Sequence, residues 1–94
     1  MTVAYTYNLA DRATYERVHG EIMPEGAKTE GMVLYAAGEE PDGALRLLEV
    51  WESDELRDRW ANATLIPALR RNGVDVSQGP PEWTRVAVLH LVKS

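Results

Sequence analysis

The sequence predicts an α+β fold in which a four-stranded antiparallel sheet carries two helices on one face. The predicted elements follow the order strand, helix, strand, hairpin, strand, helix, strand. They form two strand–helix–strand halves, residues 1–37 and 44–92, and 94 residues are enough for one domain. Right-handed crossovers in both halves place both helices on the same face, which is the ferredoxin-like βαββαβ arrangement.

The first predicted element is a strand over residues 2–8 with alternating side chains. One phase carries Val3, Tyr5 and Tyr7, and the other carries Ala4, Thr6 and Asn8. The second phase is smaller and more polar, so we expect it to face the helices and leave room for a ligand. The first phase is then expected at an interface between subunits.

A helix is predicted from a cap at Asp11 to about Met23, before the Pro24–Gly26 stretch that ends it. Its apolar stripe consists of Tyr15, Val18 and Ile22, with His19 beside them. A second strand is predicted over residues 31–38.

The two halves meet at a predicted turn over residues 39–43, where Pro41 presets φ and Gly43 takes the positive-φ position. The next strand, residues 44–52, is rich in Leu, Val and Trp and is interrupted by Arg46 and Glu49. Such a run is typical of a strand that is covered on most of both faces.

Ser53 is a predicted N-cap for a second helix, and the acidic residues that follow it favour the helix dipole. Leu56, Trp60 and Ala63 recur at helical spacing and form the expected inward stripe, while residues 57–59 are expected on a solvated face.

Pro67 cannot continue this helix smoothly, because it lacks an N–H group and clashes with the preceding turn. We expect a break near Leu65, then a short helix that Asn72 and Gly73 close. The last strand is predicted over residues 83–92.

Both phases of these strands are substantially apolar, although two helices can cover only one face. An uncovered apolar sheet face would be a large exposed patch. The sequence therefore predicts a homodimer in which two sheets face each other.

Composition narrows the classes of partner. A net charge of −5 argues against nucleic acid and against an anionic membrane surface. The absence of cysteine excludes disulfides, thiolate chemistry and most structural zinc sites. No run has the length of a signal peptide or a membrane span, so a cytoplasmic protein is expected.

Two stretches carry a family resemblance: Glu-Val-Trp-Glu-Ser at residues 49–53, leading into Leu56, and Leu-Ile-Pro-Ala-Leu at residues 65–69. Together with the element order they resemble the dimeric α/β barrel superfamily, and its antibiotic biosynthesis monooxygenase-like branch in particular. The resemblance covers nearly the whole chain as a single domain, 1–94. It is specific for fold and much less so for function, because the superfamily has many activities.

The resemblance implies a pocket between sheet and helices. Relatives use an Asn near the end of the first strand and a Trp on the second helix, which Asn8 and Trp60 match. Haem-degrading relatives carry an iron-binding His about ten residues after that Trp, where this chain has Arg70. We therefore expect no haem, no metal and no other cofactor.

Other side chains are candidates on chemical grounds. His19 and His90 have the side chain whose ordinary pKa suits acid–base work near neutrality. Tyr15, Tyr35 and Leu56 are candidates for binding a substrate. Each of these residues, like Trp60, also has a plain interpretation as a packed or surface side chain.

The resemblance implies a cofactor-independent monooxygenase that acts on a hydrophobic, carbonyl-bearing small molecule of polyketide or quinone type. The alternatives are a polyketide cyclase or isomerase of the same fold, or a non-catalytic dimer that binds a small molecule. The pocket distinguishes them: a void of several hundred Å³ at Trp60 favours an enzyme, and a Trp60 that fills the space favours the non-catalytic module.

Overall fold

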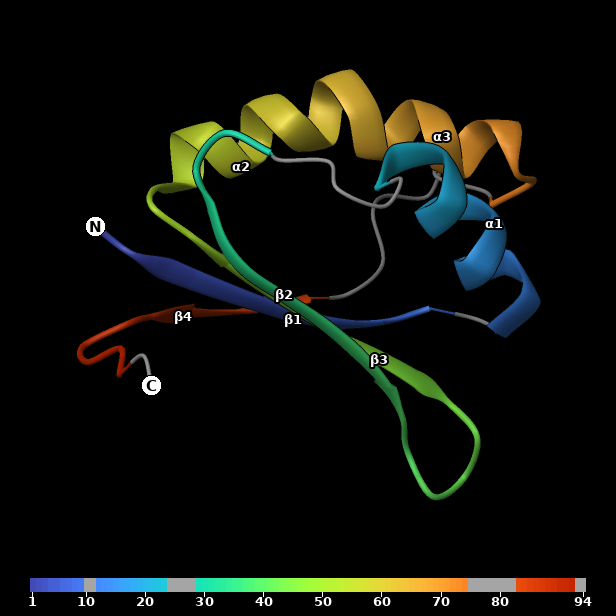
Figure 1. Ribbon diagram of the computed structural model, residues 1–94, viewed down its shortest axis with the longest axis horizontal. Coiled ribbons are helices and arrows are strands. Elements are labelled where there is room, and N and C mark those ends of the chain that lie inside the picture. The colour runs from blue at the N-terminus through green and yellow to red at the C-terminus, as the bar shows by residue number, and fades with distance from the viewer. Residues whose placement is uncertain (10–11, 24–28, 75–82, 93–94) are drawn as a thin grey trace.

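The computed structural model describes residues 1–9, 12–23, 29–74 and 83–92. The strands are β1 (Val3–Leu9), β2 (Met32–Glu39), β3 (Leu45–Trp51) and β4 (Trp83–Ala87). The helices are α1 (Arg12–Ile22), α2 (Asp54–Trp60), the π-helix η1 (Ala61–Leu65) and α3 (Ile66–Arg71). Figure 1 shows the helices forming one layer above the twisted sheet.

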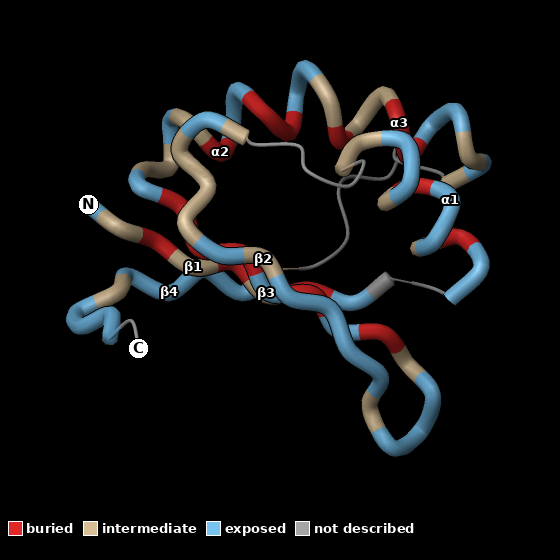
Figure 2. Tube along the Cα trace, viewed as in Figure 1, coloured by how far each residue is buried: buried red, intermediate tan, exposed pale blue. Residues whose placement is uncertain are grey.

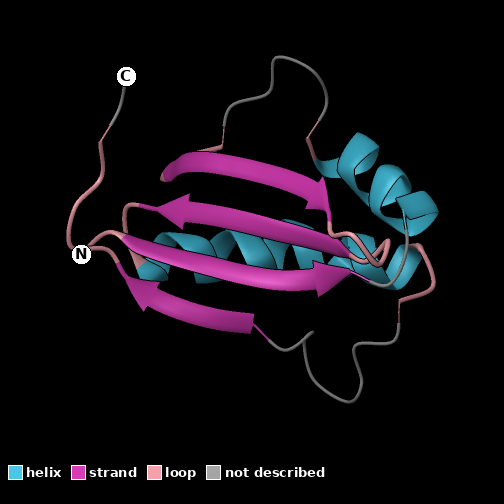
Figure 3. Cartoon of the chain, turned by 90° about the horizontal axis from the view of Figure 1, so that it is seen from below, coloured by secondary structure: helices cyan, strands magenta, loops and turns pink. Residues whose placement is uncertain are grey.

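The strands form one antiparallel sheet in the order β2-β3-β1-β4, as the ferredoxin-like fold requires. Figure 3 shows the four strands side by side with the helices on one side of them. The predicted α+β fold class is confirmed. Asp11, Pro24 and Gly26, which were expected to cap and end the first helix, lie outside the described residues.

The predicted orientation of β1 is wrong. Val3, Tyr5 and Tyr7 are buried against the helices, at 0%, 5% and 4% exposure, and Asn8 is exposed on the other face. The packed core between sheet and helices includes Val3, Tyr5 and Tyr7, and these bulky side chains fill it better than Ala4 and Thr6 would. Figure 2 shows the buried segments of sheet and helices facing each other across this interior.

The hairpin between β2 and β3 forms as its sequence predicts. Gly43 has a φ of +89°, and its N–H donates to the carbonyl oxygen of Glu40 at 2.8 Å. The Asp42 side chain accepts from the N–H of Ala44 at 2.9 Å. These bonds fix the register in which β3 leaves the turn.

The second helical stretch begins where the sequence predicts, but the predicted break near Leu65 is wrong, because helical geometry continues from Asp54 to Arg71 through a π-helical segment. The Ser53 hydroxyl accepts from the N–H of Leu56 at 3.3 Å, as an N-cap does. Pro67 lies in the first turn of α3 and cannot donate a helical hydrogen bond. The backbone widens into a π-helix just before it, where the N–H of Ile66 donates to the carbonyl oxygen of Ala61.

The inward face of this stretch differs from the predicted stripe. Arg57, Trp60 and Ala61 are buried, whereas Ala63 is exposed and Leu56 is half-buried. Arg57 was expected on a solvated face but is only 1% exposed. It can lie in the interior because a buried carboxylate, Glu49, pairs with it there.

No element in the described part of the chain covers the outer face of the sheet. Leu34 pairs with Val50 across β2 and β3, and Val86 lies opposite Ala4 across β1 and β4. Leu34, Leu48 and Val86 are 46%, 37% and 50% exposed. This face therefore exposes apolar side chains on β2, β3 and β4, whereas β1 contributes Ala4, Thr6 and Asn8 to it. No helix in the described part of the chain is long and apolar enough to cross a membrane.

Candidate functional site

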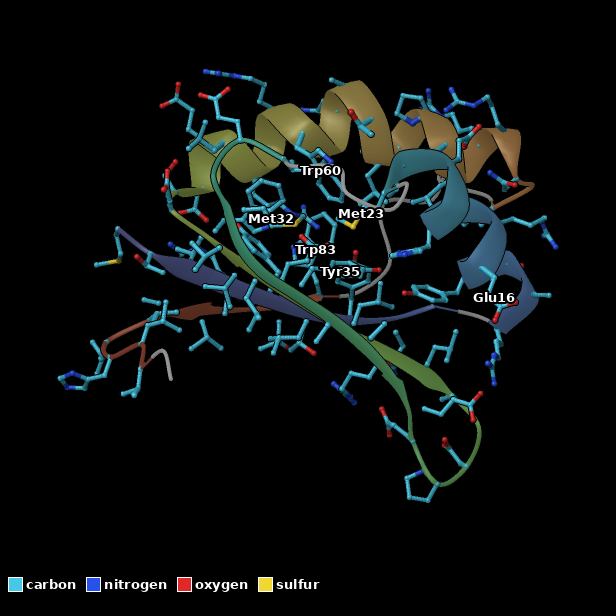
Figure 4. The ribbon with its side chains drawn as sticks, viewed as in Figure 1. Glu16, Met23, Met32, Tyr35, Trp60 and Trp83 are labelled. Atoms are coloured by element: carbon cyan, nitrogen blue, oxygen red, sulfur yellow. The ribbon has the colours of Figure 1, made fainter. Side chains whose placement is uncertain are left out.

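A small enclosed cavity lies between the sheet and the helices. Its volume is about 20 Å³, enough for roughly one water molecule. Its walls are almost entirely apolar or aromatic, and they come from α1, from all four strands and from the second helical stretch. The lining side chains include Tyr7, Tyr15, His19, Tyr35, Leu47, Trp60, Leu65 and Trp83. Figure 4 shows Trp60, Trp83 and Tyr35 gathered in this space.

One wall of the cavity is a stack of three rings with polar edges. The His19 imidazole lies against the rings of Tyr15 and Tyr35, with centroids 5.4 and 5.7 Å away. The Tyr35 hydroxyl donates to that of Tyr15 at 3.4 Å, and the Tyr15 hydroxyl lies 3.4 Å from Nδ1 of His19. The polar atoms of these rings contact one another along the stack, and the surface that they turn to the cavity is almost entirely apolar.

The Tyr35 hydroxyl remains protonated at neutral pH. Burial is the main cause that raises its pKa, and the hydrogen bond and charge of Tyr15 and the charge of Glu49 add to this. A neutral phenol at this place can donate a hydrogen bond to a carbonyl oxygen.

Two open hollows flank the cavity, each of about 330 Å³. The first, the α2 groove, is lined by Ile22, Thr29, Glu30, Leu56, Arg59, Trp60 and Thr64. It shares Ile22 and Trp60 with the cavity, so these two side chains separate the two spaces. The other hollow lies at the β2–β3 end and shares Tyr15 with the cavity.

A buried ionic cluster lies behind the sheet side of the cavity. Arg57 Nε lies 3.3 Å from Glu49 Oε1, and the two side chains are 1% and 0% exposed. Trp51 Nε1 donates to the same oxygen at 2.8 Å, and the Tyr7 hydroxyl donates to Oε2. Burial, together with the Glu49 charge, raises the pKa of Tyr7 and keeps it neutral.

The Arg57 guanidinium lies between two aromatic rings. Its carbon is 4.5 Å from the centre of the Tyr5 ring and 4.1 Å from that of Trp83. Within the described part of the chain, its Nη2 is buried and has no hydrogen-bond partner. Nearby, the Tyr5 hydroxyl donates to Asp54, which also accepts two hydrogen bonds from Arg85.

The structure brings four of the predicted site residues together. Tyr15, His19, Tyr35 and Trp60 all line the cavity, from α1, β2 and α2. Their roles in function remain predictions.

Three predicted site residues lie elsewhere. Asn8 is exposed on the outer face of the sheet, so the prediction that it shares a cavity with Trp60 is wrong. Leu56 contributes to the α2 groove and packs toward Gly31, outside the enclosed cavity. His90 follows the end of β4 and is exposed.

Tyr7, Glu49 and Arg57 were not among the predicted site residues. Two signals pointed to them: Glu49 shares its strand phase with Leu45, Leu47 and Trp51, and Arg57 precedes Trp60 by three residues on one helix face. An acid and a base that share inward phases indicate a buried pair.

A resident metal has no obvious ligand set in the residues that the structure describes. They contain no group of three or more His, Asp or Glu side chains placed to hold a metal ion. The cavity wall supplies one imidazole, that of His19, and phenols that burial keeps protonated.

Solved structures share the whole fold. The protein Rv0793 from Mycobacterium tuberculosis is 22% identical, with a TM-score of 0.70 over 99% of this chain and 100% of that one. A provisionally assigned antibiotic biosynthesis monooxygenase from Chloroflexus aurantiacus is 15% identical, with a TM-score of 0.63 over 99% and 98% of the two chains.

A third structure contains a small molecule. It is a monooxygenase from the gene ActVA-Orf6 of Streptomyces coelicolor in complex with nanaomycin D. It is 16% identical, with a TM-score of 0.57 over 99% of this chain and 90% of that one. No model of a protein family matches the sequence, and neither does any curated protein. The chain therefore has the fold of the antibiotic biosynthesis monooxygenase-like proteins, as its sequence resemblance predicts.

Proposed function

We propose that the chain binds a hydrophobic, carbonyl-bearing aromatic molecule in the cavity and acts on it as a cofactor-independent monooxygenase. One observation carries this proposal: Tyr15, His19, Tyr35 and Trp60 line a single enclosed space between sheet and helices. An apolar cavity with a few converging polar groups is the usual form of a small-molecule site. The nanaomycin D bound by the Streptomyces monooxygenase is a precedent in the same fold.

Each wall residue has a role that suits its chemistry. Trp60 gives a flat apolar surface for a planar ring system. The Tyr15 and Tyr35 hydroxyls donate hydrogen bonds to a substrate carbonyl. His19, half-buried beside them, donates a proton to the substrate or accepts one from it.

Binding requires the cavity to enlarge, because about 20 Å³ cannot hold an aromatic ring. Trp60 and Ile22 divide the cavity from the α2 groove of about 330 Å³. A turn of the Trp60 side chain would join the two spaces into a site of ordinary ligand size, on the order of 300 Å³ or more. The widened backbone of η1 begins directly after Trp60, and such π-helical segments are common at functional sites.

The proposal includes a homodimer formed through the outer face of the sheet. That face exposes Leu34, Leu48 and Val86, which a second copy would cover. Two sheets packed face to face would make the dimeric barrel that the resemblance implies.

The small volume of the cavity favours the non-catalytic alternative. If Trp60 stays in place, the chain is a non-catalytic dimer whose aromatic side chains form an ordinary core. A polyketide cyclase or isomerase is the other alternative, since the same hydroxyls and imidazole suit either proton-transfer reaction.

Two measurements, ligand binding and oxygen consumption, distinguish the monooxygenase from its two alternatives. We expect a two-ring quinone to quench tryptophan fluorescence in a saturable manner, and an anthrone-type substrate to be consumed with uptake of oxygen. His19→Gln should lower turnover, whereas His90→Gln, at an exposed position outside the cavity, should leave it unchanged. Conversion of an anthrone-type or polyketide substrate without oxygen uptake would indicate the cyclase or isomerase. Absence of any saturable binding would leave only the structural module.

A further inference from the structure

The phenolic hydroxyls in the wall of the cavity already have hydrogen-bond partners. The Tyr7 hydroxyl donates to Oε2 of Glu49. The Tyr35 hydroxyl donates to that of Tyr15, which in turn lies 3.4 Å from Nδ1 of His19. Because these groups contact one another, the surface that faces the cavity is almost entirely apolar. A molecule in the closed cavity therefore meets few free donors or acceptors.

Water is a poor occupant of such a space. A buried water molecule typically makes about three hydrogen bonds to the polar groups around it, whereas apolar cavities stay dry and bind apolar guests. The volume of about 20 Å³ limits a guest to roughly the size of one water molecule. Polarity and size together therefore select a small apolar gas molecule.

The walls can hold such a guest through dispersion contacts. Atoms around a void have no partner on one side and lose their dispersion contacts there. A gas molecule in the cavity restores those contacts at the rings of Trp60 and Trp83 and at the side chain of Leu65, which line the space. Binding of this kind needs no hydrogen bond and no charge.

We propose that the cavity is a preformed binding site for dioxygen, separate from the space that the organic substrate occupies. The role of this site in catalysis rests on the proposed monooxygenase function, because dioxygen is the second substrate of such a reaction. Binding of the gas itself depends only on the size and the apolar walls of the cavity, and it is present without an organic ligand.

The position of the cavity brings the gas next to the aromatic substrate. Ile22 and Trp60 line both the cavity and the α2 groove, so they are the side chains that lie between the two spaces. When Trp60 turns, an aromatic ring that enters from the groove of about 330 Å³ comes to lie against the small cavity. The groove then takes the ring, and the cavity holds the dioxygen beside it.

Dioxygen itself is the probe for the test, because it is paramagnetic and speeds the relaxation of nearby protons. Methyl NMR under oxygen pressure locates the gas, with nitrogen at the same pressure as the diamagnetic reference. We expect a strong and saturable effect at the methyl groups of Val18, Leu47 and Leu65, which line the cavity. Val3 and Val50 are also buried but do not line it, so their methyl groups should be affected much less.

Two substitutions fill the cavity from different elements. Ala61→Val on η1 and Val18→Ile on α1 each add carbon atoms to its wall, and each should abolish the localised relaxation effect. Ala63→Val makes the first change at an exposed position of the same π-helix and should retain the effect. Circular dichroism and thermal melting check that each variant is folded, and the second filling variant serves if the first is not.

Oxygen kinetics connect the site to the reaction. With an anthrone-type substrate, the filling variants should raise the KM for dioxygen several-fold, because the gas loses its place beside the substrate. Ala63→Val should leave this KM unchanged.

The outcomes are distinguishable from those of the proposed function. Absence of a localised relaxation effect, or an effect that survives both filling variants, overturns the dioxygen site whatever the protein catalyses. An unchanged KM for dioxygen in active filling variants overturns its role in the reaction. A protein that binds dioxygen in the cavity but consumes none with an anthrone-type substrate contradicts the monooxygenase function and leaves the binding site standing.

Discussion

At the scale of single residues, the most unusual feature is the pair formed by Glu49 and Arg57 in an otherwise apolar interior. Both carboxylate oxygens of Glu49 accept hydrogen bonds, whereas the guanidinium of Arg57 contacts mainly Glu49 and the faces of two aromatic rings. A buried ion pair often contributes little net stability compared with a well-packed apolar pair.

Replacing only one member of this buried pair should destabilise the protein far more than replacing both. Arg57→Met leaves an uncompensated buried carboxylate and should lower the free energy of unfolding by about 3–5 kcal/mol. The double variant Glu49→Gln/Arg57→Met should be less destabilised than this single variant. Urea denaturation measures both.

An exposed pair provides the control for this prediction. Arg59 and Glu55 lie 3.5 Å apart and are both exposed, so Arg59→Met should change stability by about 0–1 kcal/mol. Equal losses for Arg57→Met and Arg59→Met would contradict the structural account of the buried pair.

At the scale of elements, the approach of α2 to the segment before β2 depends on a glycine. Gly31 has a φ of +84°, and a Cβ added there would lie 2.6 Å from Cδ1 of Leu56. The carbonyl oxygen of Gly31 also accepts from the N–H of Glu52 at 2.8 Å. This glycine fixes how closely the helix start can lie against the sheet.

Two alanine substitutions separate the effect of backbone angle from that of crowding. Gly31→Ala and Gly43→Ala both place a side chain at positive φ, but Gly43 has open space around it. We expect Gly31→Ala to lower the free energy of unfolding by about 1–3 kcal/mol more than Gly43→Ala does, which is the usual cost of overpacking. Denaturation midpoints in urea test this, and similar values for the two variants would show that Leu56 moves aside.

An ion pair also connects the start of α2 to β4. Arg85 donates to both oxygens of Asp54, at 2.8 and 2.7 Å, and the Tyr5 hydroxyl adds a third hydrogen bond. These donors, Arg85 first, lower the pKa of Asp54 below its ordinary value. Because the pKa is lower in the folded state, the contribution to stability is full above the pKa of the unfolded chain.

The ion pair between Asp54 and Arg85 predicts that the stability of the protein depends on pH in the acid range. The stabilisation by Asp54 should be constant above about pH 4, the ordinary range of an aspartate, and should be lost as the pH falls further. The difference in melting temperature between the native protein and Asp54→Asn should accordingly shrink below that pH. A difference that stayed constant down to about pH 2 would contradict a salt-bridged Asp54.

At the scale of the whole molecule, the sequence predicts the element order, the hairpin, the N-cap at Ser53 and the place of Pro67 in the first turn of a short helix, because each depends on local chemistry. It predicts the strand phases less well, because both faces of β1 can be buried in an assembled protein. Side-chain size determines which face of β1 is turned toward the helices, because Tyr5 and Tyr7 fill the space there. The same error placed Asn8 in the cavity and hid Tyr7 from the candidate site.

The cavity residues also predict that the protein does not retain haem. The cavity wall includes one histidine, His19. Arg70 on α3 is exposed and cannot ligate iron. After addition of haem and desalting, the protein should show no Soret band, and metal analysis of the purified protein should find no stoichiometric metal. A retained Soret band would show that His19 or another group binds iron.

The outer face of the sheet predicts a homodimer in solution at micromolar concentration. Because no element among the described residues covers this face, a second copy should bury it over an area in the obligate range, roughly 2,000 Å² or more. Leu48 lies on an inner strand of the sheet and points outward, so Leu48→Lys should bring a charge into the interface and yield monomers. Asn62→Lys, at an exposed position on η1, should leave the dimer intact. Light scattering after gel filtration measures the mass of each. A monomeric native protein would rule out this interface, and a dimeric Leu48→Lys variant would place the contact on another surface.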